Sequence, residues 1–323
     1  MPVDFLTPEQ KATYGKFACE PNEVQLACYF HLDQFDMELI LDRRGDQNRL
    51  GVALQLTIVR FLGTFLPDLL QVPANVQIFV ANQLSIKDIG VLADYAQRET
   101  TRREHTSMIR EKYGYREFNT PPWSFRLSRI LYTRSWISNE RPILLFDFAT
   151  AWLIQNKILL PGATTLTRLI AEIRERADKR LWARLSSLPS QEQKARLEML
   201  LQVPEGNRTS QFDFYRQGPT TISGPSFNEA IDRYKALMAF DMQALNFSQI
   251  PPARLKNIAR YASTISIFKI ARMPDDKRTA LLVAFVKTFE IIALDDALDV
   301  LDLLITNIAG EAKKLGQKNA CEH

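Results

Sequence analysis

The stretch QNRLGVALQLTIVRFLGTFL, residues 47–66, carries apolar side chains at three- and four-residue intervals. This spacing predicts an α-helix that buries much of its surface. We expect Asp46 to cap this helix and Pro67 to stop it. Gly45 is expected to end the preceding helix, residues 34–44, in the left-handed conformation that favours glycine. Two helices joined by a tight glycine turn are the skeleton of a helix-turn-helix.

The same spacing continues through most of the 323 residues, so the sequence predicts an all-α fold. We expect consecutive small helical modules, helix-turn-helix-like in character, followed by a helical linker or third module. With 46% hydrophobic residues, the chain is long enough for two or three domains. The further helices that the pattern predicts cover residues 86–113, 124–138, 141–159, 164–188, 226–246, 251–271, 274–293 and 294–314.

Prolines and glycines predict the edges of the modules. Pro121 and Pro122 place one boundary near residue 120, and residues 204–226 have the Gly, Pro, Ser and Thr content of a linker. The predicted division has a first helical module at 1–118, a second at 119–205, a linker at 206–225 and a C-terminal helical module at 226–323.

The sequence predicts a cytoplasmic protein with no membrane contact. The N-terminus lacks the basic head and apolar core of a signal peptide, and the richest apolar run, ILLFDFATAWLI, is too short to span a bilayer and carries Asp147. The three cysteines cannot form a paired framework. Cys19, Cys28 and His31 offer only three metal ligands, at a spacing that no common zinc module uses. We therefore expect no cofactor.

The charge is unevenly distributed along the chain. The net charge is only +4, but residues 101–184 contain 16 Lys and Arg against 8 Asp and Glu, while the remainder has 25 against 29. A basic middle in a slightly acidic chain is typical of a protein that attracts a polyanion.

Three clusters of basic and amide side chains lie on or beside the starts of predicted helices. Arginine can hold phosphates or read guanine edges, and Asn48 could read adenine. Solvated helix faces are the plainer explanation of such clusters. The candidate DNA-binding residues are Arg43, Arg44, Asn48, Arg49, Arg102, Arg103, Arg110, Lys112, Arg116, Arg126, Arg129 and Arg134.

Thr165 and Arg168 form a fourth candidate site. They open a predicted helix directly after a Pro-Gly turn, where backbone N–H groups face an anion. A plain threonine cap explains the same residues equally well.

Enzyme motifs are weak in this sequence. Asp295, Asp296 and Asp299 match the aspartate-rich word of magnesium-dependent isoprenoid synthases, but they also form the polar face of an ordinary amphipathic helix. Only His31 and His105 could serve as bases, and neither lies near a nucleophile elbow. There is no phosphate-binding glycine loop. A small-molecule substrate is therefore not expected.

Several ordered words identify a family resemblance. They are PVDFLTPEQ, EPNEVQLACYFHLD, RRGDQNRLGVALQLTIVRFLGTFLPD, REHTSMIREKYGYREF, LLPGATTLTRLI, RLKNIARYAS and LDDALDVLDLL. The chain resembles, over essentially all its length, the N-terminal part of the replicative, cointegrate-forming transposases of the bacterial Tn-three family.

The resemblance implies sequence-specific binding of double-stranded DNA at transposon terminal inverted repeats, within DNA transposition and recombination. It also implies that the Asp-Asp-Glu catalytic domain lies farther along a longer protein, so this chain is expected not to be an enzyme. The turn around Arg43 and Arg44 is then a DNA-facing turn, and its Arg-Gly-Asp arises by chance. Two alternatives stay open: a helical protein-interaction module with a basic surface, and a magnesium-dependent helical enzyme. Self-association is compatible with each.

Overall fold

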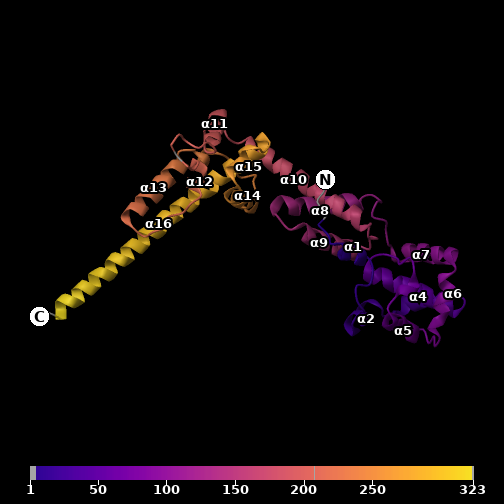
Figure 1. Ribbon diagram of the computed structural model, residues 1–323. Helices are drawn as coiled ribbons and strands as arrows, with labels where there is room; N and C mark the ends of the chain where they lie inside the picture. Colours follow the sequence, from indigo (N-terminus) through magenta and orange to yellow (C-terminus); the bar gives the residue numbers. More distant parts are fainter. Residues whose placement is uncertain (1–4, 207, 322–323) are drawn as a thin grey trace. The chain divides into compact units, whose positions relative to one another are not determined.

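The computed structural model describes residues 5–206 and 208–321 (Figure 1). Within these residues all regular structure is helical, apart from one isolated bridge that pairs Arg116 with Ile158. The predicted all-α fold is confirmed. The chain forms two compact units: residues up to Thr133 with Glu140–Ile173, and Arg134–Asn139 with the residues from Arg174 onward.

The helices of the first unit are α1 (Pro8–Thr13), α2 (Glu23–Tyr29), α3 (Gln34–Leu41), α4 (Asp46–Leu62), η1 (Leu69–Gln71), α5 (Ala74–Gln83), η2 (Ile89–Val91), α6 (Leu92–Ala96), α7 (Glu99–Tyr113) and α9 (Pro142–Gln155). Helices α8 (Trp123–Ile137) and α10 (Ala163–Ser186) are each divided between the two units. The helices of the second unit are α11 (Gln191–Met199), α12 (Gln211–Tyr215), α13 (Gly224–Met238), η3 (Met242–Ala244), α14 (Pro252–Thr264), α15 (Ile267–Ala271) and α16 (Asp275–Cys321).

Helix α4 is the centre of the first unit's larger core. Nearly every residue from Leu50 to Val59 is fully buried, and helices α2, α3, α5, α6, α7 and α9 contact it. The quoted apolar stretch does form this helix. Because its sides are covered by other helices, α4 cannot lie in a groove of DNA, and only residues in its first and last turns are partly accessible.

The ends of α3 and α4 differ from the predicted ones. Helix α3 ends at Leu41, and Gly45, with φ +83°, stands before α4 as its N-cap instead of ending α3. Asp46 lies inside the first turn, where no side-chain cap is formed. At the other end, Gly63 takes a left-handed φ of +73° and ends the helix before Pro67 is reached. Glycine is needed here because φ is positive and because a β-carbon at Gly63 would lie 2.6 Å from Ile154.

The single helix predicted over 86–113 is divided into η2, α6 and α7. The break lets Tyr95 of α6 stack on His105 of α7, with ring centroids 5.7 Å apart and the hydroxyl 3.0 Å from Nδ1. In one straight helix these residues would be about 15 Å apart along the axis. Burial of both side chains therefore favours the turn.

A second core in the first unit joins α9 to the parts of α8 and α10 that belong to it. Leu127 and Leu131 of α8, Leu145 and Leu153 of α9, and Leu166 of α10 are all buried there. The N-terminal segment adds Leu6 to the same cluster. Three helices around one small core, with a short turn before the third, resemble a helix-turn-helix domain. The predicted boundary near residue 118 falls inside this unit.

The core of the second unit is built around the first half of α16. Residues 279–286 are buried, and α13 and α14 contact the helix (Figure 1). Two helices were predicted over 274–314, but α16 is one continuous helix because no glycine or proline interrupts residues 275–309. Farther along, α16 exposes apolar side chains such as Leu298, Ile305 and Ile308.

The segment predicted as a linker, residues 206–225, contributes to this core. Helix α12 lies within it, and Phe212 is fully buried with its ring centroid 4.1 Å from that of Phe285. Although the segment is mostly polar, the buried ring of Phe212 packs against α16 and holds the segment there.

Candidate nucleic-acid interface

The cationic turn before α4 is held together largely by its own side chains. Asn48 donates from Nδ2 to the carbonyl of Arg44 at 2.8 Å, and Arg49 donates from Nε to the carbonyl of Arg43 at 2.9 Å. Arg43 forms an ion pair with Asp42. Arg44 is exposed. The structure therefore gives Asn48 and Arg49 a role in fixing the turn, and leaves Arg44 as its most accessible cation.

Most cations of α7 also have partners inside the first unit. Arg102 donates to the carbonyl of Pro67 at 2.6 Å, Arg103 lies 2.5 Å from Glu99, and Arg110 lies 2.8 Å from Glu117. Lys112, in the last turn, is exposed. Much of the positive charge predicted for this helix is therefore balanced locally.

A buried carboxylate fixes the ends of α3 and α7 against α4. Asp36 is fully buried; it accepts two hydrogen bonds from Arg60 at 2.9 and 3.0 Å and one from the Tyr113 hydroxyl at 2.6 Å. Burial alone would raise the pKa of Asp36, but the hydrogen bonds from Arg60 and Tyr113 hold that pKa below its ordinary value. The network holds Tyr113, at the end of α7, against the first turn of α3.

The charge of Arg43 also affects the pKa of a buried histidine, His105. Burial lowers the pKa of His105, and the nearby charge of Arg43 lowers it further. His105 is thus favoured in its neutral form, in which Nδ1 can pair with the hydroxyl of Tyr95. This candidate base belongs to the core and not to an accessible site.

Two arginines of the first unit stack on one tryptophan. The guanidinium carbons of Arg116 and Arg126 lie 5.4 and 5.0 Å from the ring centre of Trp123, and both arginine side chains are exposed. Such contacts hold a guanidinium in place while its N–H groups stay free to donate. We call Arg116, Trp123 and Arg126 the tryptophan cluster. Arg129 is exposed one turn farther along α8.

Trp123 was not among the DNA-binding residues predicted from the sequence. Its signal was Arg126 at the i+3 position of the same helix, a spacing that places two side chains on one face. Arg116 reaches the ring only because the chain turns between Tyr113 and Trp123, which no periodicity indicates.

The start of α10 presents polar side chains on the outside of the three-helix core. Leu166 and Ile170 are fully buried, whereas Thr165 and Arg168 are exposed, Arg168 with 67% of its side chain accessible. The nearest acid to Arg168 is Glu172, with 3.8 Å between nitrogen and oxygen. The first turn of α10 is therefore the accessible end of the third helix in a helix-turn-helix-like core.

Backbone pairing ties the tryptophan cluster to the segment that leads into α10. Arg116 donates its N–H to the carbonyl of Lys157 at 3.0 Å, and its own carbonyl accepts from Leu159 at 2.8 Å. Leu160 in turn donates to the carbonyl of Gly63 at 2.9 Å. The backbone of Arg116 is thereby fixed to residues 157–159, which lie just before the Pro-Gly turn that precedes α10.

The predicted residue Arg134 is half-buried and belongs to the second unit.

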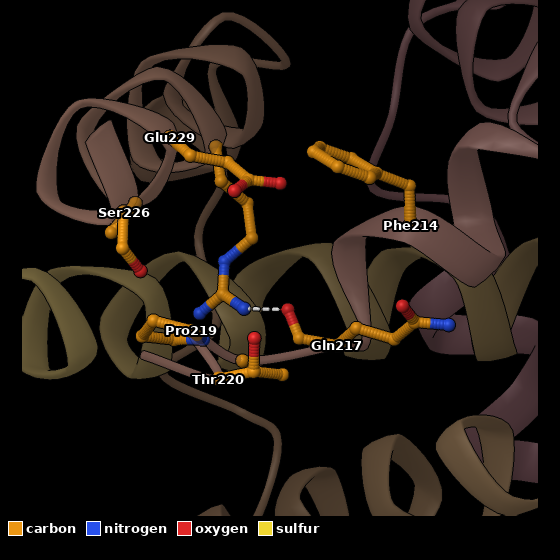
Figure 2. Close-up of a pocket in the computed structure, with 9 residues that line it drawn as sticks. Phe214, Gln217, Pro219, Thr220, Ser226 and Glu229 are labelled. Carbon is orange, nitrogen blue, oxygen red and sulfur yellow. Dashed lines mark hydrogen bonds between the residues drawn. The ribbon is translucent and has the colours of Figure 1, made fainter. Parts of the chain in front are cut away.

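The aspartates of α16 are arranged differently from a magnesium site. Asp296 forms an ion pair with Arg233, whose side chain is only 4% exposed. Arg233 also lines a cavity of about 140 Å³. Figure 2 shows residues of this cavity, with a dashed line for the hydrogen bond that the carbonyl of Gln217 accepts from Arg233. Asp295 and Asp299 are exposed. The middle carboxylate of the predicted motif is therefore committed to an arginine.

No group of three or more His, Cys, Asp or Glu side chains within the described residues could hold a metal ion. Cys19 and Cys28 are free thiols on the surface. Over the same part of the chain, every helix is too short or too polar to cross a membrane.

Comparison with known proteins places this chain in a family. A family model described as a domain of unknown function, DUF4158, matches residues 5–173, which end where the first unit ends. The chain is 61% identical over 318 residues to the transposase for transposon gamma-delta of Escherichia coli (strain K12), covering 98% of this chain and 32% of the relative.

More distant relatives show the same partial coverage. The transposase for transposon Tn1546 of Enterococcus faecium is 26% identical over 96% of this chain and 31% of the relative. The transposase for transposon Tn501 of Pseudomonas aeruginosa is 27% identical over 93% of this chain and 30% of the relative. The chain thus spans about a third of the length of the curated relatives that it matches, and the predicted resemblance to transposases is confirmed.

Proposed function

Because the chain belongs to the DUF4158 family, and because transposases are similar to it along nearly all its length, we propose that it binds double-stranded DNA at transposon terminal inverted repeats. The observation that carries the proposal is the accessible start of α10 beside the tryptophan cluster. Both belong to the first unit, the part that the family model covers.

The third helix of the three-helix core is the element suited to a DNA groove. In helix-turn-helix proteins the N-terminal residues of the recognition helix contact base edges, and in three-helix variants that helix is the third. Arg168 has a largely exposed guanidinium on this helix and can read guanine. Thr165 lies in the first turn, where backbone N–H groups and a hydroxyl suit a phosphate. Helix α4, which follows the glycine turn that was predicted to face DNA, is enclosed by the core.

The tryptophan cluster supplies phosphate contacts beside that helix. Arg116 and Arg126 are exposed, and Trp123 restricts the positions of both guanidinium groups. Restricted cations lose less conformational freedom when they bind. Arg44, Lys112 and Arg129 are further exposed cations of the first unit, and they too are proposed to contact DNA phosphates.

The chemistry of transposition is proposed to lie outside this chain. The relatives are about three times as long, and the residues described here offer no metal-holding group. We therefore assign recognition of transposon ends to this region, in the cytoplasm where that DNA lies, and strand transfer to the part of a transposase that it does not cover.

The experiment is fluorescence anisotropy with the gamma-delta terminal inverted repeat and a scrambled duplex, across a salt series. Arg168→Ala should lower the preference for the repeat, because it removes a base contact; one such contact discriminates by about 1–3 kcal/mol. Arg126→Ala should weaken binding to both duplexes and lower the salt slope by about one, because it removes a phosphate contact.

Arg103→Ala is the matched control. It removes the same charge from the first unit, but the Arg103 side chain is exposed and already paired with Glu99 at 2.5 Å. We expect it to bind both duplexes as the wild type does. If Arg168→Ala and Arg126→Ala also bind like the wild type, the proposed interface is wrong.

A further inference from the structure

The second unit contains a cavity that the proposed duplex interface does not use. Its volume is about 140 Å³, and it is lined by residues of α14, of α10 beyond residue 174, and of the first turns of α16. Leu281, nearly fully buried, supplies an apolar wall, and the other lining side chains are mostly polar or aromatic. Aromatic and apolar walls with a few placed polar groups are typical of sites for small planar ligands.

One wall of the cavity is held rigidly. Arg254 has only 6% of its surface exposed; it donates to Oδ1 of Asn139 at 3.0 Å and forms an ion pair with Asp178. The charge of Arg254 is therefore neutralised, and the pair orients the Asn139 amide. The Nδ2 group of Asn139 remains able to donate.

The opposite wall comes from one face of α14. Asn257 and Tyr261 are one helical turn apart, which places their side chains on the same face. Tyr261 is 46% exposed, so its side chain is accessible to a stacking partner. Asn257 accepts a hydrogen bond from Arg260 at 3.4 Å through Oδ1, which leaves its Nδ2 group to donate.

A cation and a second aromatic ring complete the cavity. The Lys277 ammonium lies 4.7 Å from the ring centre of Trp182. Lysine held over an aromatic ring keeps its N–H donors for a further acceptor. The cavity thus offers ammonium and amide donors around aromatic surface, and its single carboxylate, Asp178, is already paired.

The surrounding segment is strongly cationic. Besides the buried, paired Arg254, residues 252–273 contain four exposed cations, Lys256, Arg260, Lys269 and Arg272, and no aspartate or glutamate. Exposed cations near a cavity with aromatic walls combine phosphate-binding charge with a stacking surface, as in proteins that bind single-stranded nucleic acid.

We propose that this cavity takes one unstacked nucleobase of a DNA strand. Tyr261 stacks on the base, the amide groups of Asn257 and Asn139 donate to its carbonyl or ring-nitrogen acceptors, and Lys277 contacts the adjoining phosphate. The inference rests on the proposal that the chain binds DNA, but it concerns a different unit and a different state of the strand. A metal ion does not suit the cavity, because its one carboxylate is committed to Arg254.

The test compares two single-stranded probes of equal length, an oligothymidylate and an abasic oligomer that keeps every phosphate but has no bases. The wild-type chain should bind the oligothymidylate roughly five- to hundredfold more tightly, the range for one aromatic–base stack. Tyr261→Ala should remove this preference and leave affinity for the abasic oligomer unchanged. Asn257→Ala should reduce it.

Phe268→Ala is the matched control, because Phe268 is an aromatic residue of the same unit, 71% exposed and outside the cavity. It should keep the wild-type preference. Photocrosslinking with a 5-iodouracil oligonucleotide should join the base to the peptide that contains Tyr261. Equal binding of both probes by the wild type, or a preference that survives Tyr261→Ala, would overturn the inference.

The same variants separate this inference from the duplex proposal. Tyr261→Ala should bind the terminal inverted repeat duplex like the wild type, because the duplex interface belongs to the first unit. If the wild type fails to bind that duplex but still prefers the oligothymidylate, the duplex proposal fails and the base-binding cavity stands.

Discussion

Replacing Asp36 with asparagine tests how the first unit holds the ends of α3 and α7 against α4. Asp36 is fully buried and accepts hydrogen bonds from Arg60 and Tyr113. Asn has nearly the same shape but no charge, so Arg60 would lose its counter-ion. Removing one partner of a buried ion pair costs about 3–5 kcal/mol; because Arg60 keeps 27% of its side chain exposed, we expect the lower end, about 3 kcal/mol.

Urea unfolding measures the free energy of unfolding, and hydrogen–deuterium exchange of peptides from α4 reports the stability of the first unit. Peptides from α13 serve as an internal reference for the second unit. Asp42→Asn is the control, because it makes the same chemical change in an ion pair whose aspartate is 71% exposed. We expect that control to cost less than about 0.5 kcal/mol. A loss in Asp36→Asn no larger than in Asp42→Asn would refute the reasoning.

The role of Asp36 also predicts how the stability of the first unit changes with pH. The folded-state pKa of Asp36 is below its ordinary value, so its contribution is fully present above the unfolded pKa of about 3.9 and is lost as pH falls through the folded pKa. The wild type should therefore lose stability more steeply than Asp36→Asn below about pH 4.

Two further substitutions test the packing of each unit. Gly51→Ala would place a β-carbon 2.5 Å from ring atoms of Tyr95 on α6, and we expect this overpacking to lower the free energy of unfolding of the first unit by about 1–3 kcal/mol in the same urea assay. Phe212→Ala removes a fully buried ring from the second unit and should cost about 3–5 kcal/mol there, with α4 exchange unchanged. Phe214→Ala, on the same short helix but 40% exposed, should cost much less, and equal losses would contradict the assigned role of Phe212.

The helices with the clearest apolar pattern could be predicted from the sequence. The stretch around Leu50 and Ile58 forms the central helix of the first core, and the predicted helix over 164–188 corresponds to α10. These predictions succeed because periodic apolar residues report local burial directly. Arg168 and Thr165, singled out at the start of that helix, are exposed there.

The features that sequence reasoning missed depend on contacts between distant residues. The break before α7 exists because Tyr95 and His105 stack on each other, and the polar segment around Phe212 is ordered because that ring meets Phe285. Neither partner is visible in a local pattern. The engagement of Asn48 and Arg49 inside their own turn is equally hidden, since composition cannot separate a cation that faces DNA from one that holds a loop.

The central claim, recognition of transposon ends by this chain, is tested most directly by fluorescence anisotropy of the wild-type protein with the gamma-delta terminal inverted repeat against a scrambled duplex. We expect a preference of about a hundredfold, roughly 3 kcal/mol, and affinity that falls steeply as salt is raised. Weak binding that is equal for the two duplexes would contradict the account.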